Sequence, residues 1–82
     1  MRLPRDVSGE DLARALQAFG YRVTRQTGSH LRMTTLDRGE HHITIPRHPS
    51  LRVGTLAAVL ASVAEHFQLP KDDVALRLFG PA

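Results

Sequence analysis

The tripeptide Gly28-Ser29-His30 is the first place in the sequence where residue types and spacing suggest chemistry. Glycine permits a tight turn and serine can bond nearby backbone, so the histidine would open the strand that follows. An imidazole both accepts and donates protons near neutral pH. That property suits general acid–base catalysis on a ribose 2′-hydroxyl or on the leaving oxygen of a phosphodiester. Because a lone surface histidine is more often inert, the tripeptide needs support from its surroundings.

A second candidate region runs from Pro46-Arg47-His48-Pro49 through Arg52 to Gly54-Thr55-Leu56. Free N–H groups at the start of a helix favour anions, and flanking arginines strengthen that preference, so the region could hold a phosphate. The alternative is a proline-stiffened connection in which Thr55 is an ordinary N-cap residue. For Thr55 taken alone, this alternative is favoured.

Three histidines, His41, His42 and His48, raise the question of a metal site, because imidazole binds zinc, copper and nickel. Adjacent strand residues point to opposite faces, so His41 and His42 cannot easily share one ion. We therefore expect no metal and no other cofactor. His41 is expected to be a partly buried packing residue, and His66 a cation near the C-terminal end of a helix.

The charge of the chain favours a polyanionic partner. Its 82 residues carry a formal net charge of +3, and all but one of the eleven basic residues are arginine. Six of these arginines lie between Arg22 and Arg52. The planar guanidinium suits bidentate phosphate contacts. A solvated basic surface without a partner explains the charge equally well.

Composition and missing motifs exclude several classes of protein. No apolar run approaches the roughly 20 residues of a membrane span, and the chain has no cysteine for a disulfide, a thiolate metal site or a nucleophile. The segment 1–6 lacks the apolar stretch of a secretory signal, so we expect a cytoplasmic protein. There is no Walker or GxGxxG motif and no marked serine nucleophile. With four aromatic residues, binding that relies on base stacking is disfavoured.

Hydrophobic periodicity predicts the elements that must position these residues. Ser8 is expected to cap a helix over 9–19 that stops at Gly20. Alternating patterns predict strands at the following positions: 21–26, 30–36 and 41–45, with turns between them. Helical periodicity returns at Thr55 and stops at Pro70, and over 71–79 a short helix is favoured over a strand.

These elements predict one domain over residues 1–82, an α+β two-layer α-β-β-β-α sandwich with a short C-terminal helix. The helices would cover one face of the antiparallel sheet. The other face would be basic and rich in hydroxyl groups, and would carry Arg22, Thr24, His30, Arg32, Thr34, His42 and Thr44.

Taken together, these landmarks resemble the HicA (YcfA-like) toxin family over about residues 2–79. The matching parts are the helix from Ser8 that ends in Phe19-Gly20-Tyr21, the Gly28-Ser29-His30 turn, Pro46 with His48, and Gly54-Thr55-Leu56 followed by Val59-Leu60. The resemblance implies a fold like that of double-stranded-RNA-binding domains. It also implies an mRNA-cleaving toxin, held inactive by a HicB-like antitoxin, with His30 as the catalytic histidine. The sequence departs from the family in having arginines where lysines are expected before Gly54.

We therefore expect a metal-independent mRNA endoribonuclease in which His30 performs acid–base cleavage. The residues expected to bind RNA are Arg22, Ser29, Arg32, Arg47, His48, Arg52 and Thr55, with His48 as the first candidate for a second acid–base group. RNA alone carries the 2′-hydroxyl, so no DNA contact by the protein itself is expected. No contact with a membrane is expected either.

Two other functions remain open. One is a non-catalytic double-stranded-RNA-binding module, which is disfavoured because such modules set lysines at the start of their last long helix. The other is a basic domain that docks an acidic protein.

Overall fold

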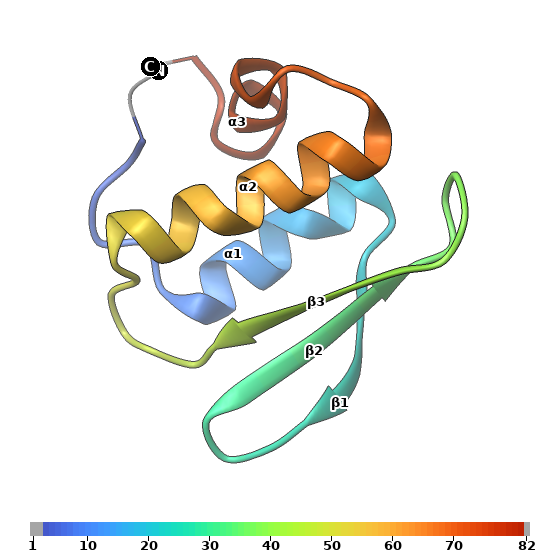
Figure 1. The fold of residues 1–82 in the computed structure, drawn as a ribbon. Helices are drawn as coiled ribbons and strands as arrows, with labels where there is room; N and C mark the ends of the chain where they lie inside the picture. The colour runs from blue at the N-terminus through green and yellow to red at the C-terminus, as the bar shows by residue number, and fades with distance from the viewer. Residues whose placement is uncertain (1–2, 82) are drawn as a thin grey trace.

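The computed structural model describes residues 3–81, which form a three-stranded antiparallel sheet in the order β1-β2-β3 with helices on one side of it (Figure 1). The elements are α1 (Gly9–Ala15), the 3-10 helix η1 (Leu16–Phe19), β1 (Arg22–Gln26), β2 (His30–Thr35), β3 (His41–Pro46), α2 (Val53–Phe67) and α3 (Lys71–Phe79). This arrangement confirms the α+β prediction and its element order.

The first helix begins where the sequence predicts. Ser8 accepts a hydrogen bond from the Asp11 backbone N–H at 2.9 Å, and its own N–H donates to the Asp11 carboxylate at 3.3 Å. This reciprocal capping satisfies two backbone donors that a helix start would otherwise leave free. The last turn tightens into η1, and Gly20 then takes φ 81°, a left-handed conformation that favours glycine.

The start of α2 differs from the prediction. The helix begins at Val53, Arg52 occupies the N-cap position without a side-chain cap, and Thr55 lies inside the first turn. The expectation that Thr55 is the N-cap is therefore wrong. Hydrophobic periodicity could not detect this turn, because Val53 is exposed and Gly54 has no side chain.

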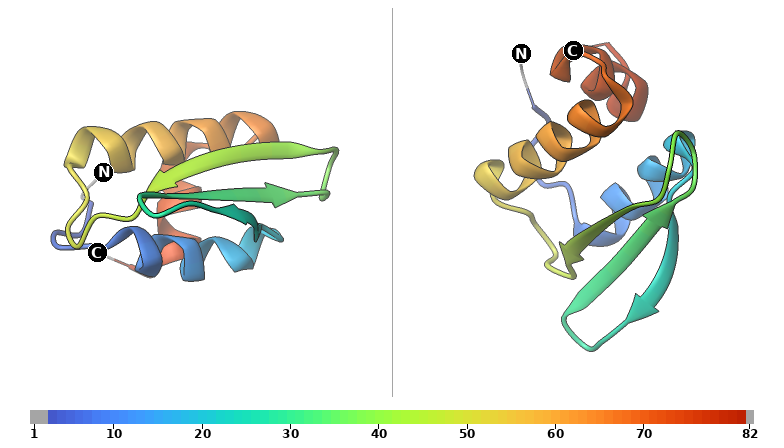
Figure 2. Two further views of the ribbon diagram at one scale, coloured as in Figure 1. Left: turned by 90° about the horizontal axis from the view of Figure 1, so that it is seen from below. Right: turned by 45° about the vertical axis from the view of Figure 1, so that its right-hand side comes forward.

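The core lies between the inner face of the sheet and the helices. On the sheet it consists of alternate residues of β2 and β3, which are Leu31, Met33, Ile43 and Ile45. The helices bury apolar residues at helical spacing against them, namely Leu12, Leu16, Phe19, Leu56, Val59, Leu60 and Val63. The helix α3 confirms the prediction of a short helix over 71–79. It packs on α2 and α1 on the side away from the sheet (Figure 2). Within residues 3–81, no helix is both long and apolar enough to span a membrane.

Candidate functional site

The outer face of the sheet carries no helix, and its polar residues are exposed as predicted, with Thr34 half-buried. Residues that lie directly opposite each other on antiparallel strands share a face. His30 lies opposite Pro46, Arg32 opposite Thr44, and Thr34 opposite His42. We call the surface formed by these outward residues and their neighbours on β1 the open face.

A β-bulge in β1 adds an arginine that simple alternation misses. Arg22 pairs with Thr34 and Val23 with Met33, but the register then shifts, so that Arg25 pairs with Arg32. Thr24 is the extra residue. Strict alternation would turn Arg25 away from Arg22, whereas the bulge returns it to the open face beside Arg32. The sequence contains no signal for this shift, because a bulge is defined by the pairing of two strands.

Among residues 3–81, the three arginines of the open face, Arg22, Arg25 and Arg32, have no acidic partner. The ion pairs within residues 3–81 involve other residues, namely Arg14 with Asp11, Arg47 with Glu10 and His42 with Glu40. The guanidinium groups of the open face are therefore available to an external anion such as a phosphate.

His30 lies at the end of the open face, in a turn that is closed by hydrogen bonds. Its backbone N–H donates to the Thr27 hydroxyl at 3.1 Å, and the Thr27 N–H donates to the His30 carbonyl at 3.0 Å. The Ser29 hydroxyl lies 3.0 Å from Nδ1 of His30. A hydroxyl can donate or accept, so Ser29 serves either tautomer. Within the described residues nothing bonds Nε2, and the imidazole is exposed.

His42, the other histidine of the open face, is held at both nitrogens. Its Nε2 lies 2.8 Å from the Glu40 carboxylate, and its Nδ1 lies 2.7 Å from the Thr34 hydroxyl. That hydroxyl lies 2.9 Å from the hydroxyl of Thr24 on the neighbouring strand. These hydrogen bonds fix the orientation of His42. Among residues 3–81, His30 is therefore the histidine of the open face that keeps one ring nitrogen without a hydrogen bond.

The loop after β3 lies against the turn that holds His30. The Arg47 N–H donates to the Ser29 carbonyl at 2.8 Å, and the Gly9 N–H donates to the His48 carbonyl at 2.9 Å. A Cβ at Gly9 would collide with the carbonyl oxygen of Pro46, so this close approach of α1 requires glycine. The contacts fix the backbone on which the exposed side chain of His48 stands.

The predicted RNA-binding residues do not all share one surface. Arg22 and Arg32 lie on the open face with His30, and Ser29 lies beside it. Arg47 lies on the other side of the sheet, because its guanidinium reaches Glu10 of α1 at 3.4 Å. The structure therefore does not bring Arg47 together with His30.

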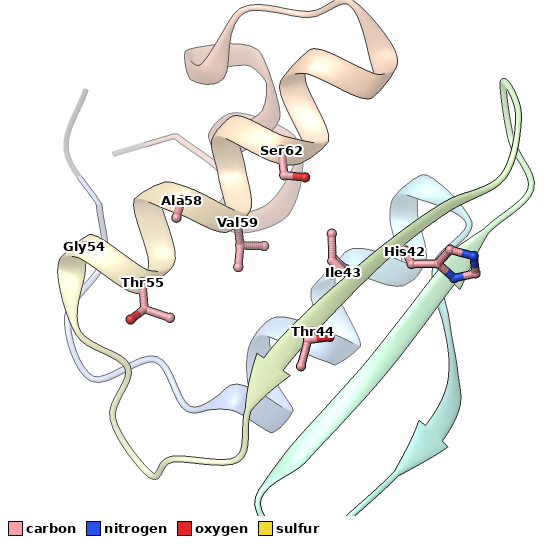
Figure 3. A pocket seen from close by; sticks show the side chains of 8 residues that line it. All are labelled: His42, Ile43, Thr44, Gly54, Thr55, Ala58, Val59 and Ser62. Carbon is pink, nitrogen blue, oxygen red and sulfur yellow. The ribbon is translucent and has the colours of Figure 1, made fainter.

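Thr55 lines a groove of about 500 Å³ between β3 and α2 (Figure 3). The other lining residues are His42, Ile43, Thr44, Gly54, Ala58, Val59 and Ser62. Arg52, exposed at the N-cap of α2, directly precedes this part of the helix.

The remaining histidines have structural roles, as predicted. His41 is half-buried, and its Nδ1 and Nε2 lie 2.7 Å from the Tyr21 hydroxyl and 3.2 Å from the Ser62 hydroxyl. Its ring stacks on that of His66 with ring centroids 4.5 Å apart. Burial, followed by repulsion from neighbouring His66 and His42, lowers the pKa of His41, and burial raises the pKa of Tyr21 to about 12. His66, in the last turn of α2, bonds the Asp37 carbonyl at 2.9 Å. Within residues 3–81 no three His, Asp or Glu side chains gather as metal ligands.

Comparison with known proteins supports one family. No curated protein and no solved structure matched the chain. The family model described as the HicA toxin of bacterial toxin–antitoxin matches residues 9–64, which include α1, the whole sheet, the His30 turn and most of α2. The chain therefore belongs to the HicA toxin family of bacterial toxin–antitoxin systems.

Proposed function

We propose that this protein is a toxin that cleaves mRNA without a metal ion and that His30 transfers the proton. The observation that carries the proposal is the exposed His30 imidazole, supported at Nδ1 by Ser29, at the end of a face whose three arginines form no ion pair with the rest of the described chain. Membership of a toxin family and a basic face point to the same class of target, since RNA is the polyanion with a 2′-hydroxyl beside each phosphate.

The cleavage would proceed by internal attack. Arg22, Arg25 and Arg32 hold the phosphates, and Nε2 of His30 takes the proton of a 2′-hydroxyl. The 2′-oxygen attacks the neighbouring phosphorus, and the bond from phosphorus to the 5′-oxygen breaks. The 5′-oxygen takes up a proton, and the products are a 2′,3′-cyclic phosphate and a 5′-hydroxyl end. One positioned acid–base group supplies about 10²–10⁴-fold, so a modest nuclease is expected.

Further assignments belong to this proposal. His48 is the candidate for the second acid–base group, because its loop is bonded to the Ser29 turn. Arg52 and Thr55 extend the RNA path toward α2, on a fold like that of double-stranded-RNA-binding domains. A HicB-like antitoxin would inhibit the protein by covering the open face, and the single domain would act in the cytoplasm.

The test is RNA cleavage in EDTA by the unaltered protein and by His30→Ala. We expect the substitution to reduce cleavage by at least about 10²-fold while the circular dichroism spectrum is unchanged, because His30 is exposed and supports no core contact. Arg5→Ala, which changes an exposed arginine away from the site, serves as the control and should cleave normally. RNA binding without cleavage by either protein would favour a non-catalytic RNA-binding module.

A further inference from the structure

We propose that the groove between β3 and α2 binds one unpaired nucleotide of the RNA, so that the substrate is single-stranded at this point. The inference rests on the proposed function, because it concerns how the same RNA is held beside the open face.

The groove is continuous with the open face. His42 and Thr44 belong to both surfaces, and Thr44 lies opposite Arg32 in the sheet. An RNA backbone held by Arg32 therefore passes directly beside the groove. None of the residues that line the groove is acidic, and the Glu40 carboxylate beside it is paired with the lining residue His42 at 2.8 Å.

The shape and lining of the groove suit a nucleobase. Its volume of about 500 Å³ lies in the range of pockets that hold small ligands. Gly54 and Ala58 occupy successive turns of α2 and keep the groove wide, since no atom lies within 4 Å of a Cβ built at Gly54. Ile43 and Val59 line the groove where it meets the core and keep 7 % of their surface exposed each, so a base would contact a narrow aliphatic strip there together with Thr55 and Ala58 (Figure 3).

The free edge of β3 supplies backbone hydrogen-bonding groups to the same space. In an antiparallel pair, residues alternate between bonding the partner strand and pointing away from it. Because the Arg47 N–H bonds Ser29 of the β2 side, the alternation turns the N–H and C=O groups of His42 and Thr44 outward, toward the groove. Within residues 3–81 no backbone hydrogen bond joins these two residues to α2. Fixed donors and acceptors of this kind can read the edge of a base.

A nucleotide fits these features better than an added peptide strand. The next outward position on β3 is Pro46, which has no N–H, so an added strand would find only His42 and Thr44 to pair with. A base in a duplex cannot enter the groove, because its edge is paired and its faces are stacked. Only a base that is unpaired and displaced from the stack can be bound in this way.

The test uses ¹H–¹⁵N NMR of the His30→Ala protein, which binds RNA without cleaving it under the proposed function. A short single-stranded oligoribonucleotide is titrated, and then a blunt duplex that contains the same sequence. We expect the amides of Thr44, Thr55 and Ala58 to shift with the single strand and not with the duplex. In the same background, Ala58→Leu should weaken single-strand binding about tenfold by filling the groove. Ala18→Leu, at an exposed alanine of η1 outside the groove, should bind normally.

Unmoved groove amides, a preference for the duplex, or unchanged binding by Ala58→Leu would each overturn the proposal. Failure of the proposed function is recognised separately, by absence of cleavage in the unaltered protein. If that protein does not cleave RNA but the groove amides still respond to the single strand, the nucleotide site stands without the nuclease.

Discussion

Replacing Arg25 with alanine tests whether the bulge in β1 matters for RNA binding. If Arg22, Arg25 and Arg32 each neutralise one phosphate of a single strand, these three contacts together contribute about −2 to the slope of the logarithm of the binding constant against the logarithm of salt concentration. Removing one contact reduces the magnitude of that contribution, which becomes about −1.4. Between 50 and 200 mM salt, the affinity of the unaltered face should therefore fall about 20-fold, and that of Arg25→Ala about 7-fold.

Fluorescence anisotropy with a labelled oligoribonucleotide in the His30→Ala background measures these slopes. Arg47→Ala is the matched control, because it removes the same charge from the other side of the sheet, where Arg47 lies beside Glu10. We expect its slope to stay near that of the parent protein. A reduced slope for Arg47→Ala together with an unchanged slope for Arg25→Ala would refute the assignment of faces.

Two further predictions concern stability. The pKa of His41 is lower in the folded than in the unfolded chain, so the unfolded chain binds the proton more readily. The free energy of unfolding should therefore fall as the pH drops below about 6.5. Urea denaturation at pH 7.5 and at pH 5 should show a larger loss in the unaltered protein than in His41→Gln, and equal losses would contradict the prediction. Ser8→Ala, which removes the cap of α1, should cost about 1 kcal/mol by urea denaturation. Ser50→Ala, which removes an exposed 3.4 Å hydrogen bond to Asp6, should cost less, and equal costs would contradict the prediction.

The sequence predicts the elements well because their burial is periodic. The helix over 9–19, the strands and their exposed faces all follow from apolar residues at helical or alternate spacing, and His30 is placed correctly on the open face. The family resemblance is confirmed by the match over residues 9–64.

The features that the sequence analysis missed have different physical causes. The bulge at Thr24 is a property of two strands and leaves no trace in one. The position of Arg47 follows from a local pattern. If the alternation of the buried residues Ile43 and Ile45 is continued past Pro46, residue 47 falls on the side of the sheet that faces the helices. The start of α2 was missed since neither Val53 nor Gly54 contributes to an apolar stripe.

The narrow approach of α1 to the end of β3 links two segments that are distant along the chain. Since no side chain fits at residue 9, the bulk of that residue determines how far the strand end and the following loop stand from the helix. The distance of α1 from the His48 loop is therefore controlled from a position that is itself buried and carries no reactive group. Enlarging residue 9 would move the end of β3 and this loop away from α1 without changing any residue that RNA could touch.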